Sequence, residues 1–397
     1  MAWIKPGINP PKIRAAISLA TLLFALPLGW KGVSGIFIWL SPFIMLNSVI
    51  ILKSYVFLNL AGVLVFLASF FRKRFFCNYL CCSGLCLDKI SENSRFRASV
   101  HRKLPRTGAV LAVISITGAF AGIPLLILLD PQAILHGFFS VFPGKTGVAA
   151  IISLAGFPLI LAVNYFLPHI WCGKICPLGG LQDIAAEAGS AISKIRKEKD
   201  EERNETVYRP ARRYFIAAGA GLAGGAILSG ISKTHFNEGW IRPPGSIDPS
   251  TFGTLCIRCG NCIKSCPTGI LKQHEDFADI ISWLTPEVEY TNGYCIEDCN
   301  SCSKVCPTGS ITLFSKDAKN RIFMGLAKVS DDECLLSKNR ECDRCKAACS
   351  YKAVEISRKG SAGQLLPEIS RVRCVGCGAC KVICPAYAIK ILPVPAG

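Results

Sequence analysis

The chain divides by hydrophobicity into a first part with long apolar runs and a second part without them. A membrane helix needs about twenty mostly apolar residues, and runs that approach this length stop near residue 232. A helix satisfies its own backbone hydrogen bonds, so each run predicts a helix that can enter a bilayer. The runs cover residues 15–30, 35–52, 55–71, 108–129, 147–168 and 214–231.

Basic residues indicate which loops face the cytoplasm, because Lys and Arg are enriched on that side of a membrane. Residues 88–107 contain six of them and residues 169–213 contain nine, whereas the loop at 130–146 contains one. The basic run at 72–74 should also lie inside, so the run at 35–52 must re-enter or lie along the outer interface. We therefore expect five spans, with the loop at 130–146 outside.

Sixteen of the 22 cysteines fall into four groups of four in the second part. The first and last groups follow C-x2-C-x2-C-x3-C-P, which is the spacing of a loop around a 4Fe-4S cubane, and the second group lengthens only the first spacer. In the third group seven residues separate the first two cysteines, and Ser350 replaces the proline. The groups are Cys256, Cys259, Cys262 and Cys266; Cys295, Cys299, Cys302 and Cys306; Cys334, Cys342, Cys345 and Cys349; and Cys374, Cys377, Cys380 and Cys384.

Such motifs work in pairs, because in two-cluster ferredoxins the cysteine before the proline ligates the partner cluster. The four motifs therefore predict four clusters in two bicluster units, a row that can conduct single electrons. Zinc and disulfides are the alternative interpretations. Zinc sites join two short cysteine pairs across a longer spacer, and disulfide frameworks do not favour this repeated motif. The pattern favours iron-sulfur clusters over both.

Composition fits a membrane half that precedes a soluble half. The 397 residues are 51% hydrophobic and 18% charged, with a mean hydropathy of +0.38. The formal net charge of +18 would suit nucleic acid, but residues 233–397 have only 21 basic against 17 acidic side chains. Four clusters of about −2 each would leave this half mildly acidic. We therefore expect no nucleic-acid partner.

The membrane half repeats the motif aromatic-C-x3-C-x2-G at the cytoplasmic ends of the second and fourth spans, with Asp88 aligned on Asp183. It therefore contains an internal duplication. Each copy supplies two thiols, and two copies in a pseudo-twofold arrangement supply the four that a cubane needs. They could share a fifth cluster, serve as another redox or structural thiol site, or simply pack as reduced thiols, which the cytosol maintains without a metal. The four cysteines are Cys77, Cys81, Cys172 and Cys176.

A twin-arginine segment precedes the last apolar run. Residues 211–216 read Ala-Arg-Arg-Tyr-Phe-Ile, which matches the core of a Tat export signal, although alanine stands where serine is preferred. This signal suits a domain that acquires its clusters before export, and because it is internal we interpret it as an uncleaved anchor. Gly219, Gly221 and Gly224 also satisfy G-x-G-x-x-G, but no strand precedes them, so close helix packing is the better explanation.

The paired C-x3-C motifs, the Arg-rich run before the first of them and Asp130-Pro131 resemble the NapH/NosR/MauN class of membrane iron-sulfur proteins over residues 13–185. That class is associated with quinol oxidation and electron delivery to periplasmic enzymes. The twin-arginine segment and the four cysteine groups resemble NapG/MauM-type periplasmic polyferredoxins. The chain as a whole thus resembles a fusion of the two. It departs from the first class at Cys82, where proline is usual, and in a charged linker where a ferredoxin segment is expected.

The resemblance implies an α-helical membrane domain of about five spans with an internal duplication, followed by a small α+β polyferredoxin domain of the bicluster-ferredoxin type. The expected location is the bacterial inner (cytoplasmic) membrane, multi-pass, with the C-terminal domain in the periplasm. The expected segments are a membrane domain at 1–190, a charged cytoplasmic linker at 191–211, a Tat-like transmembrane anchor at 212–232 and the polyferredoxin domain at 233–397.

Missing motifs narrow the function. C-x-x-C-H, the haem c attachment motif, does not occur, the five histidines all lie outside the middle of the spans, and we find no flavin motif. We therefore expect an electron-transfer protein, which would be a quinol dehydrogenase subunit if it oxidises quinol itself. Its partners would be the quinol pool of the bilayer and a periplasmic reductase or cytochrome. Asp130 and His136 are candidates for the quinol's proton acceptor, although a plain helix terminus also explains Asp130.

Two other functions fit the same residues. The chain could be a maturation or redox-regulatory protein that donates electrons while a periplasmic enzyme's cofactor is assembled, as the MauM/MauN and NosR resemblance suggests. It could also be a zinc-stabilised scaffold, which would be colourless and would contain no acid-labile sulfide.

Overall fold

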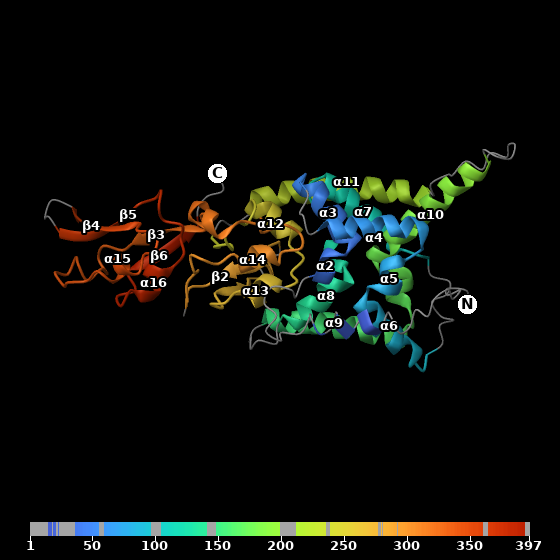
Figure 1. The fold of residues 1–397 in the computed structure, drawn as a ribbon, viewed down its shortest axis with the longest axis horizontal. Coiled ribbons are helices and arrows are strands. Elements are labelled where there is room, and N and C mark those ends of the chain that lie inside the picture. The colour runs from blue at the N-terminus through green and yellow to red at the C-terminus, as the bar shows by residue number, and fades with distance from the viewer. Residues whose placement is uncertain are drawn as a thin grey trace. The chain divides into compact units, whose positions relative to one another are not determined.

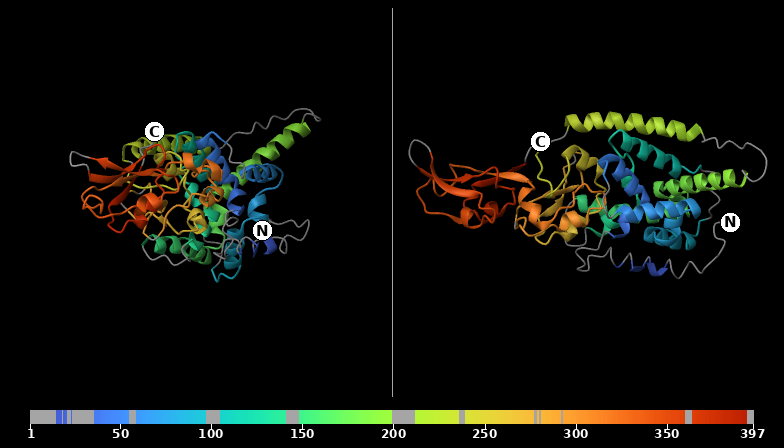
Figure 2. Two further views of the ribbon diagram at one scale, coloured as in Figure 1. Left: turned by 60° about the vertical axis from the view of Figure 1, so that its left-hand side comes forward. Right: turned by 45° about the horizontal axis from the view of Figure 1, so that its top comes forward.

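The computed structural model divides into two compact units, residues 1–234 with 254–259 and residues 235–253 with 260–397. Helices make up the first unit, and short strands occur in the second, as the ribbon views show (Figures 1 and 2). Most of the predicted first run and most of the predicted linker lie outside the described residues. The structure describes residues 15–17, 19–20, 23, 36–54, 59–96, 105–140, 148–198, 212–235, 239–276, 279, 281–291, 293–359 and 364–393.

Several helices of the first unit begin where the sequence supplies a cap. The side chain of Ser41 accepts a hydrogen bond from the backbone N–H of Ile44, and Pro42 occupies the first helical turn. A new helix therefore begins inside the apolar run at 35–52, which is not one continuous element. The helices of this part are α2 (Ile36–Trp39), α3 (Pro42–Leu52), α4 (Leu60–Phe71), α5 (Phe75–Tyr79) and α6 (Cys82–Glu92).

Asp130 caps a further helix, which corrects the prediction of a loop at 130–146. Its carboxylate accepts a hydrogen bond from the N–H of Gln132 (2.9 Å), and Pro131 follows at the first helical position. Both Asp130 and His136 are buried. The remaining helices of the unit are α7 (Gly108–Phe120), η2 (Ile127–Leu129), α8 (Pro131–Phe139), α9 (Val148–Phe166), η3 (Trp171–Ile175), α10 (Pro177–Glu198) and α11 (Arg212–His235).

Helix length bears on the predicted spans. Among the described residues one helix, Arg212–Ser232 within α11, is long and apolar enough to cross a membrane. Helices α3, α4 and α7 have 11, 12 and 13 residues. At 1.5 Å per residue they measure about 17 to 20 Å, against about 30 Å for the hydrocarbon core. The structure therefore confirms the helix at the last run but not the five-span arrangement.

Close contacts between helices hold the first unit together. A Cβ atom on Gly180 would lie 2.1 Å from the carbonyl carbon of Gly108, so α10 packs directly on the start of α7. A Cβ atom on Gly221 would lie 2.5 Å from the carbonyl oxygen of Ile114, and one on Gly225 would lie 2.7 Å from that of Gly118. Helix α11 thus approaches α7 through Gly221 and Gly225. Of the three glycines for which the sequence predicted close packing, Gly221 lies at this contact, whereas a Cβ atom on Gly219 would meet nothing within 4 Å.

The second unit combines short helices with three two-stranded antiparallel sheets. The strand pairs are β1 (Leu271–Gln273) with β2 (Pro286–Val288), β3 (Gly325–Val329) with β6 (Ile389–Pro393), and β4 (Val354–Lys359) with β5 (Gln364–Ile369). The other helices are α12 (Pro249–Leu255), α13 (Asn261–Ser265), α14 (Ser301–Lys304), η4 (Lys316–Arg321), α15 (Arg344–Ala347) and α16 (Ala379–Ile383). This is the small α+β architecture that the sequence predicted.

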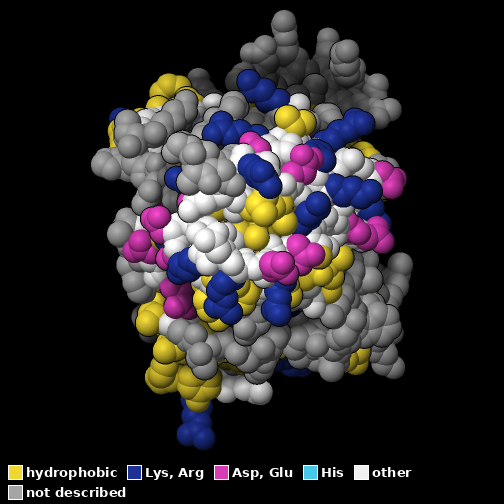
Figure 3. All heavy atoms as spheres, turned by 90° about the vertical axis from the view of Figure 1, so that its left-hand side faces the viewer, with side chains coloured by type: hydrophobic (Ala, Val, Ile, Leu, Met, Phe, Trp, Pro, Cys, Tyr) yellow, Lys and Arg dark blue, Asp and Glu magenta, His cyan; other side chains and the backbone are white. Residues whose placement is uncertain are grey.

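Charges of both signs are interspersed on the face of the second unit that Figure 3 presents, around small apolar patches. Arg373 and Glu355 form one of the ion pairs of this unit. Val372 and Tyr387, which flank the last cysteine group, are exposed apolar side chains, at 83% and 82%. The described residues visible on this face therefore form no extended region of one charge sign.

Candidate metal centres

The four cysteine groups share one backbone feature. The third residue after the last cysteine has a positive φ in every group: Gly269, Gly309, Lys352 and Tyr387 lie between 49° and 72°. A positive φ is uncommon for residues other than glycine, so the shared turn is a specific one. It also occurs in the third group, where serine replaces proline. The structure therefore gives the irregular group the same exit turn as the regular ones.

A short helix carries the third cysteine of each group, namely α13, α14, α15 or α16. In the first and last groups the helix is preceded by a glycine with positive φ, Gly260 at 68° and Gly378 at 85°. These two groups also share a positive φ at the residue before their second cysteine, Arg258 and Gly376. The identical sequence spacing of the two groups thus produces the same loop.

The third and fourth groups together line one cavity. Four cysteines line it: Cys349, Cys374, Cys377 and Cys380. Three of them come from the fourth group, and Cys349 is the last cysteine of the third. This is the exchange of the final ligand expected for a bicluster unit.

The exchange is reciprocal. Cys384, the last cysteine of the fourth group, packs against a buried cluster that contains Cys334 of the third group. Cys345 lies within electrostatic range of both Cys342 and Cys334. A second set of four thiols therefore forms from three members of the third group and one of the fourth.

One direction of this exchange is also seen between the first two groups. Cys266, the last cysteine of the first group, lies within electrostatic range of Cys295 and Cys302. Cys262 and Cys266 of the first group belong to the second unit, together with the other three groups. Within the second unit the observed neighbours pair group one with two and group three with four.

Backbone contacts connect the two pairs. The N–H of Cys295 donates to the carbonyl oxygen of Cys377 at 2.9 Å. The hydroxyl of Tyr290 donates to the carbonyl oxygen of Gly376 at 2.5 Å. Group two therefore lies beside group four, and the spatial order of the groups is one, two, four, three.

Burial makes these thiols hard to ionise, which suits a cluster because its iron ions compensate the charge of the thiolates. Burial raises the pKa of Cys302 and of Cys380 to about 12, so both stay protonated at neutral pH unless a metal displaces the proton. Among the described residues no three His, Cys, Asp or Glu side chains converge as a single ion would require. A cubane does not need such convergence, because its four thiolates bind four separate iron atoms.

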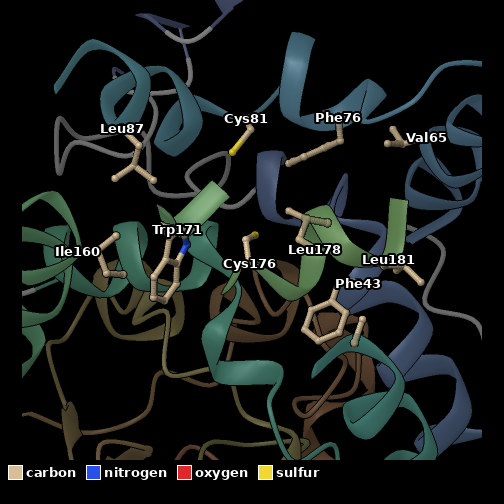
Figure 4. Packing of buried hydrophobic residues seen from close by; sticks show 11 residues of the cluster. Phe43, Val65, Phe76, Cys81, Leu87, Ile160, Trp171, Cys176, Leu178 and Leu181 are labelled. Atoms are coloured by element: carbon tan, nitrogen blue, oxygen red, sulfur yellow. The ribbon is translucent and has the colours of Figure 1, made fainter. Parts of the chain in front are cut away.

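The four cysteines of the first unit also come together. Cys81 lies within electrostatic range of Cys77 and Cys172, and Cys176 lies within range of the same two thiols. Figure 4 shows the sulfur atoms of Cys81 and Cys176 pointing toward one another inside the core. The structure thus brings both C-x3-C motifs to one place, as the duplication predicted.

Two glutamines donate hydrogen bonds to these thiols. The side-chain amide of Gln182 is 3.2 Å from Cys77 Sγ, and that of Gln132 is 3.3 Å from Cys81 Sγ. Gln182 and Gln132 are both buried. Amide donors of this kind favour a thiolate over a neutral thiol, which suits a metal ligand. Simple packing of reduced thiols does not require them.

Reciprocal ion pairs join the two copies of the motif. Arg74 stands three residues before Cys77 and pairs with Asp183 of the other copy, 2.6 Å apart. His169 stands three residues before Cys172 and lies 3.5 Å from Asp88. Arg74 and His169 both have a positive φ, 55° and 62°. The two copies therefore share a local backbone and exchange partners.

Family models for iron-sulfur domains match both units. The model described as "4Fe-4S dicluster domain" matches residues 255–310, and one described as "4Fe-4S binding domain" matches residues 367–390. A second model with that description matches twice in the first unit, at 55–102 and 149–197, which are the two copies of the duplication. The chain is thus an iron-sulfur protein with several 4Fe-4S binding domains.

The chain is also similar to curated ferredoxin-type proteins. It is 31% identical over 197 residues to the ferredoxin-type protein NapG of Escherichia coli (strain K12), which covers 46% of this chain and 84% of NapG. The chain belongs to the NapG family of ferredoxin-type proteins. The chain is also similar to the ferredoxin-type protein NapF of Escherichia coli (strain K12). The two are 35% identical over 163 residues, which cover 41% of this chain and 90% of NapF.

A third relative is a methylamine utilisation ferredoxin-type protein. The ferredoxin-type protein MauM of Methylorubrum extorquens is 29% identical over 205 residues, which cover 46% of this chain and 90% of MauM. No solved structure matches the chain. These matches confirm the NapG/MauM resemblance for this member of the NapG family.

The structure adds one residue beside the second cysteine group that the sequence did not single out. Lys319 in η4 is 2% exposed, and its Nζ is 3.2 Å from Cys295 Sγ. It stands thirteen residues after Cys306, and lysines are common on surfaces. The only signal in the sequence was the lengthened first spacer of the second group. Lys319 donates to the carbonyl oxygen of Ile296 in this spacer and to that of Cys299, which follows it.

Proposed function

We propose that this chain is a membrane-anchored electron-transfer protein that takes electrons from the quinol pool and delivers them to a periplasmic reductase or cytochrome. It would be a fusion of a NapH-like membrane protein with a NapG-like polyferredoxin. The observation that supports it most is the cavity lined by Cys349, Cys374, Cys377 and Cys380, because two separate motifs contribute to it as in a bicluster ferredoxin. The clusters would supply one-electron redox centres.

The sixteen cysteines of the four groups would hold four clusters. Each cluster would take three ligands from its own group and the last ligand from the partner group. Residues Cys77, Cys81, Cys172 and Cys176 would hold a fifth in the first unit. The spatial order one, two, four, three would make the groups a continuous row in the second unit, with the contact between Cys295 and Cys377 at its middle.

The proposed route begins at the membrane. Support comes from helix α11, which is long and apolar enough to cross a bilayer, and from the duplicated motif that resembles the NapH/NosR/MauN class. Asp130 supports it less, because it caps α8 and accepts a hydrogen bond from Ser41 Oγ at 2.7 Å. A structural role therefore accounts for that carboxylate, and the proton acceptor has no assigned residue.

The full-length protein in anaerobically prepared membranes provides the test. A reduced quinol analogue should bleach the visible absorbance of the clusters and produce the electron paramagnetic resonance signals of reduced 4Fe-4S centres. Iron and acid-labile sulfide should be present at about four of each per cluster. Clusters that dithionite reduces but quinol never reduces would exclude the quinol route, and zinc in a colourless protein would exclude electron transfer altogether.

The location needs a separate measurement. A protease added to intact spheroplasts should cleave residues 233–397 and leave the region of the C-x3-C motifs intact. The periplasmic enzyme should then lose its electron supply. Cleavage only after the membrane is opened would place the polyferredoxin domain in the cytoplasm and refute the proposed topology.

The similarity to MauM favours a second candidate, an electron donor for the maturation of a periplasmic enzyme's cofactor. A deletion strain distinguishes the two. If the partner enzyme is fully matured but receives no electrons, the chain carries electrons in steady turnover. If the partner accumulates without its cofactor, and a partner that has already matured works without the chain, maturation is the function.

A further inference from the structure

A buried lysine contacts the second cysteine group through all of its donors. Lys319 Nζ is 2.5 Å from the carbonyl oxygen of Ile296, 2.6 Å from that of Cys299 and 3.2 Å from Cys295 Sγ. The residue is 2% exposed. Three acceptors require three N–H donors, which only the charged ammonium form of lysine has. The geometry therefore places a full positive charge against a cluster ligand.

The unusual spacer of this group explains why the charge is there. The first and last groups have two residues between their first two cysteines, and the second of these has a positive φ, as in Arg258 and Gly376. The second group has three residues there, and among the described residues of this loop none has a positive φ. Its path directs two carbonyl oxygens toward Lys319. Lys319 donates to both of these partly buried acceptors.

We propose that Lys319 is a potential-setting residue, a fixed charge that raises the reduction potential of the cluster held by the second group. The inference rests on the proposed function in one respect, namely that this group holds a cluster. Reduction adds one electron to the cluster, and a buried positive charge at hydrogen-bonding distance from a ligand sulfur stabilises the added negative charge. The lengthened spacer and the lysine act together as one unit.

The chain offers a matched control for this charge. Lys316 lies in the same short helix, η4, and its Nζ is 3.2 Å from Asp298 Oδ2 in the same spacer. Both partners of that pair are exposed, with 51% and 71% of their side chains accessible. Lys316 therefore holds the same loop without touching a cysteine. Replacing it tests the loop anchor alone, whereas replacing Lys319 removes the charge at the thiolate.

The test uses the full-length protein, purified anaerobically, as Lys319→Met and Lys316→Met variants. Iron and sulfide are counted, and each cluster is titrated with dithionite while electron paramagnetic resonance is recorded. Dithionite supplies the electron, the cluster accepts it, and Lys319 keeps its protons. In Lys319→Met one cluster should become at least tenfold harder to reduce, which equals a shift of 59 mV for a one-electron couple. Lys316→Met should leave every potential unchanged.

Two further variants cover the case in which Lys319→Met loses iron. Lys319→Arg keeps the charge and should retain the cluster at its original potential. Lys319→Gln keeps donors without the charge and should retain the cluster at a lowered potential. Unchanged potentials in a fully loaded Met or Gln variant would overturn the inference, as would loss of the cluster from all three variants. A wild-type protein that lacks clusters would refute the proposed function instead.

Discussion

Arg74 and Asp183 form the more buried of the two ion pairs between the copies of the duplicated motif. Only 14% and 8% of their side chains are exposed, whereas 53% and 30% are exposed in the pair His169–Asp88. The two pairs occupy equivalent positions, so each serves as a control for the other. Removing one partner of a buried pair leaves the other charge without compensation, but an exposed charge is hydrated by water.

We therefore expect Asp183→Asn to destabilise the first unit by about 3 to 5 kcal/mol, and Asp88→Asn by about 0 to 1 kcal/mol. Asp88 raises the pKa of His169 above its usual value near 6.5. The exposed pair should therefore contribute fully below pH 6.5 and lose its effect as the pH rises through the raised pKa of His169. Thermal unfolding of the detergent-solubilised protein at several pH values measures both effects. An Asp88→Asn effect that persists at alkaline pH would contradict the assignment.

Cys349 tests the exchange of ligands between cysteine groups. Its side chain lines the cavity of the fourth group, although it belongs to the third. We expect Cys349→Ser to perturb or remove one cluster, with a loss of up to about four irons, and to leave the site around Cys334 loaded. Ser350→Ala, at the next position, is the control and should keep all the iron. Iron analysis with electron paramagnetic resonance checks both, and a loss confined to the site of Cys334 would show that no exchange occurs.

At the scale of elements, the contact between α7 and α11 depends on particular glycines. A side chain at Gly221 would overlap the backbone of Ile114, but one at Gly219 would meet nothing within 4 Å. We therefore expect Gly221→Leu to separate the two helices and cost about 1 to 3 kcal/mol, as overpacking does. Gly219→Leu on the same helix should be nearly neutral. The midpoint of thermal aggregation in detergent, followed by size-exclusion chromatography, measures the difference, and equal effects of the two variants would exclude the close packing.

The sequence predicted the type of most elements but not all of their ends. Apolar runs located helices correctly at 42–52, 60–71, 108–120 and 148–166. Hydrophobicity did not show where they stop, because Ser41 and Asp130 cap new helices inside or beside those runs. Residues 130–139 were predicted as loop since their helix is short. Asp130 and His136 of this helix are buried, and a single sequence does not reveal that burial.

For the candidate sites, spacing predicted the sets of cysteines and the exchange of the last ligand. It did not predict that group two lies beside group four, because that contact joins backbone atoms of Cys295 and Cys377, far apart in the chain. Lys319, Gln132 and Gln182 were also missed. Their residue types are ordinary, and only the fold brings their donors to sulfur atoms.

At the scale of the whole molecule, the two units should respond differently to metal removal. The second unit has short strands and a small core around its thiols, so cluster binding and folding should be one event. We expect iron chelation in the reduced, anaerobic protein to make residues 260–397 sensitive to protease and to abolish its β-sheet signal in circular dichroism. The helices of the first unit should persist. A second unit that stays protease-resistant without iron would show that its fold is independent of the clusters.

The exchange of final ligands has a consequence for biosynthesis. The set of thiols around Cys334 includes Cys384, and the cavity of the fourth group includes Cys349. A nascent chain that has emerged from the ribosome only as far as residue 380 therefore lacks a ligand for one of these two sites. Completion of both proposed sites would then have to wait until Cys384 has emerged. A truncation that removes Cys384 would leave a site incomplete whose other proposed ligands lie more than thirty residues upstream.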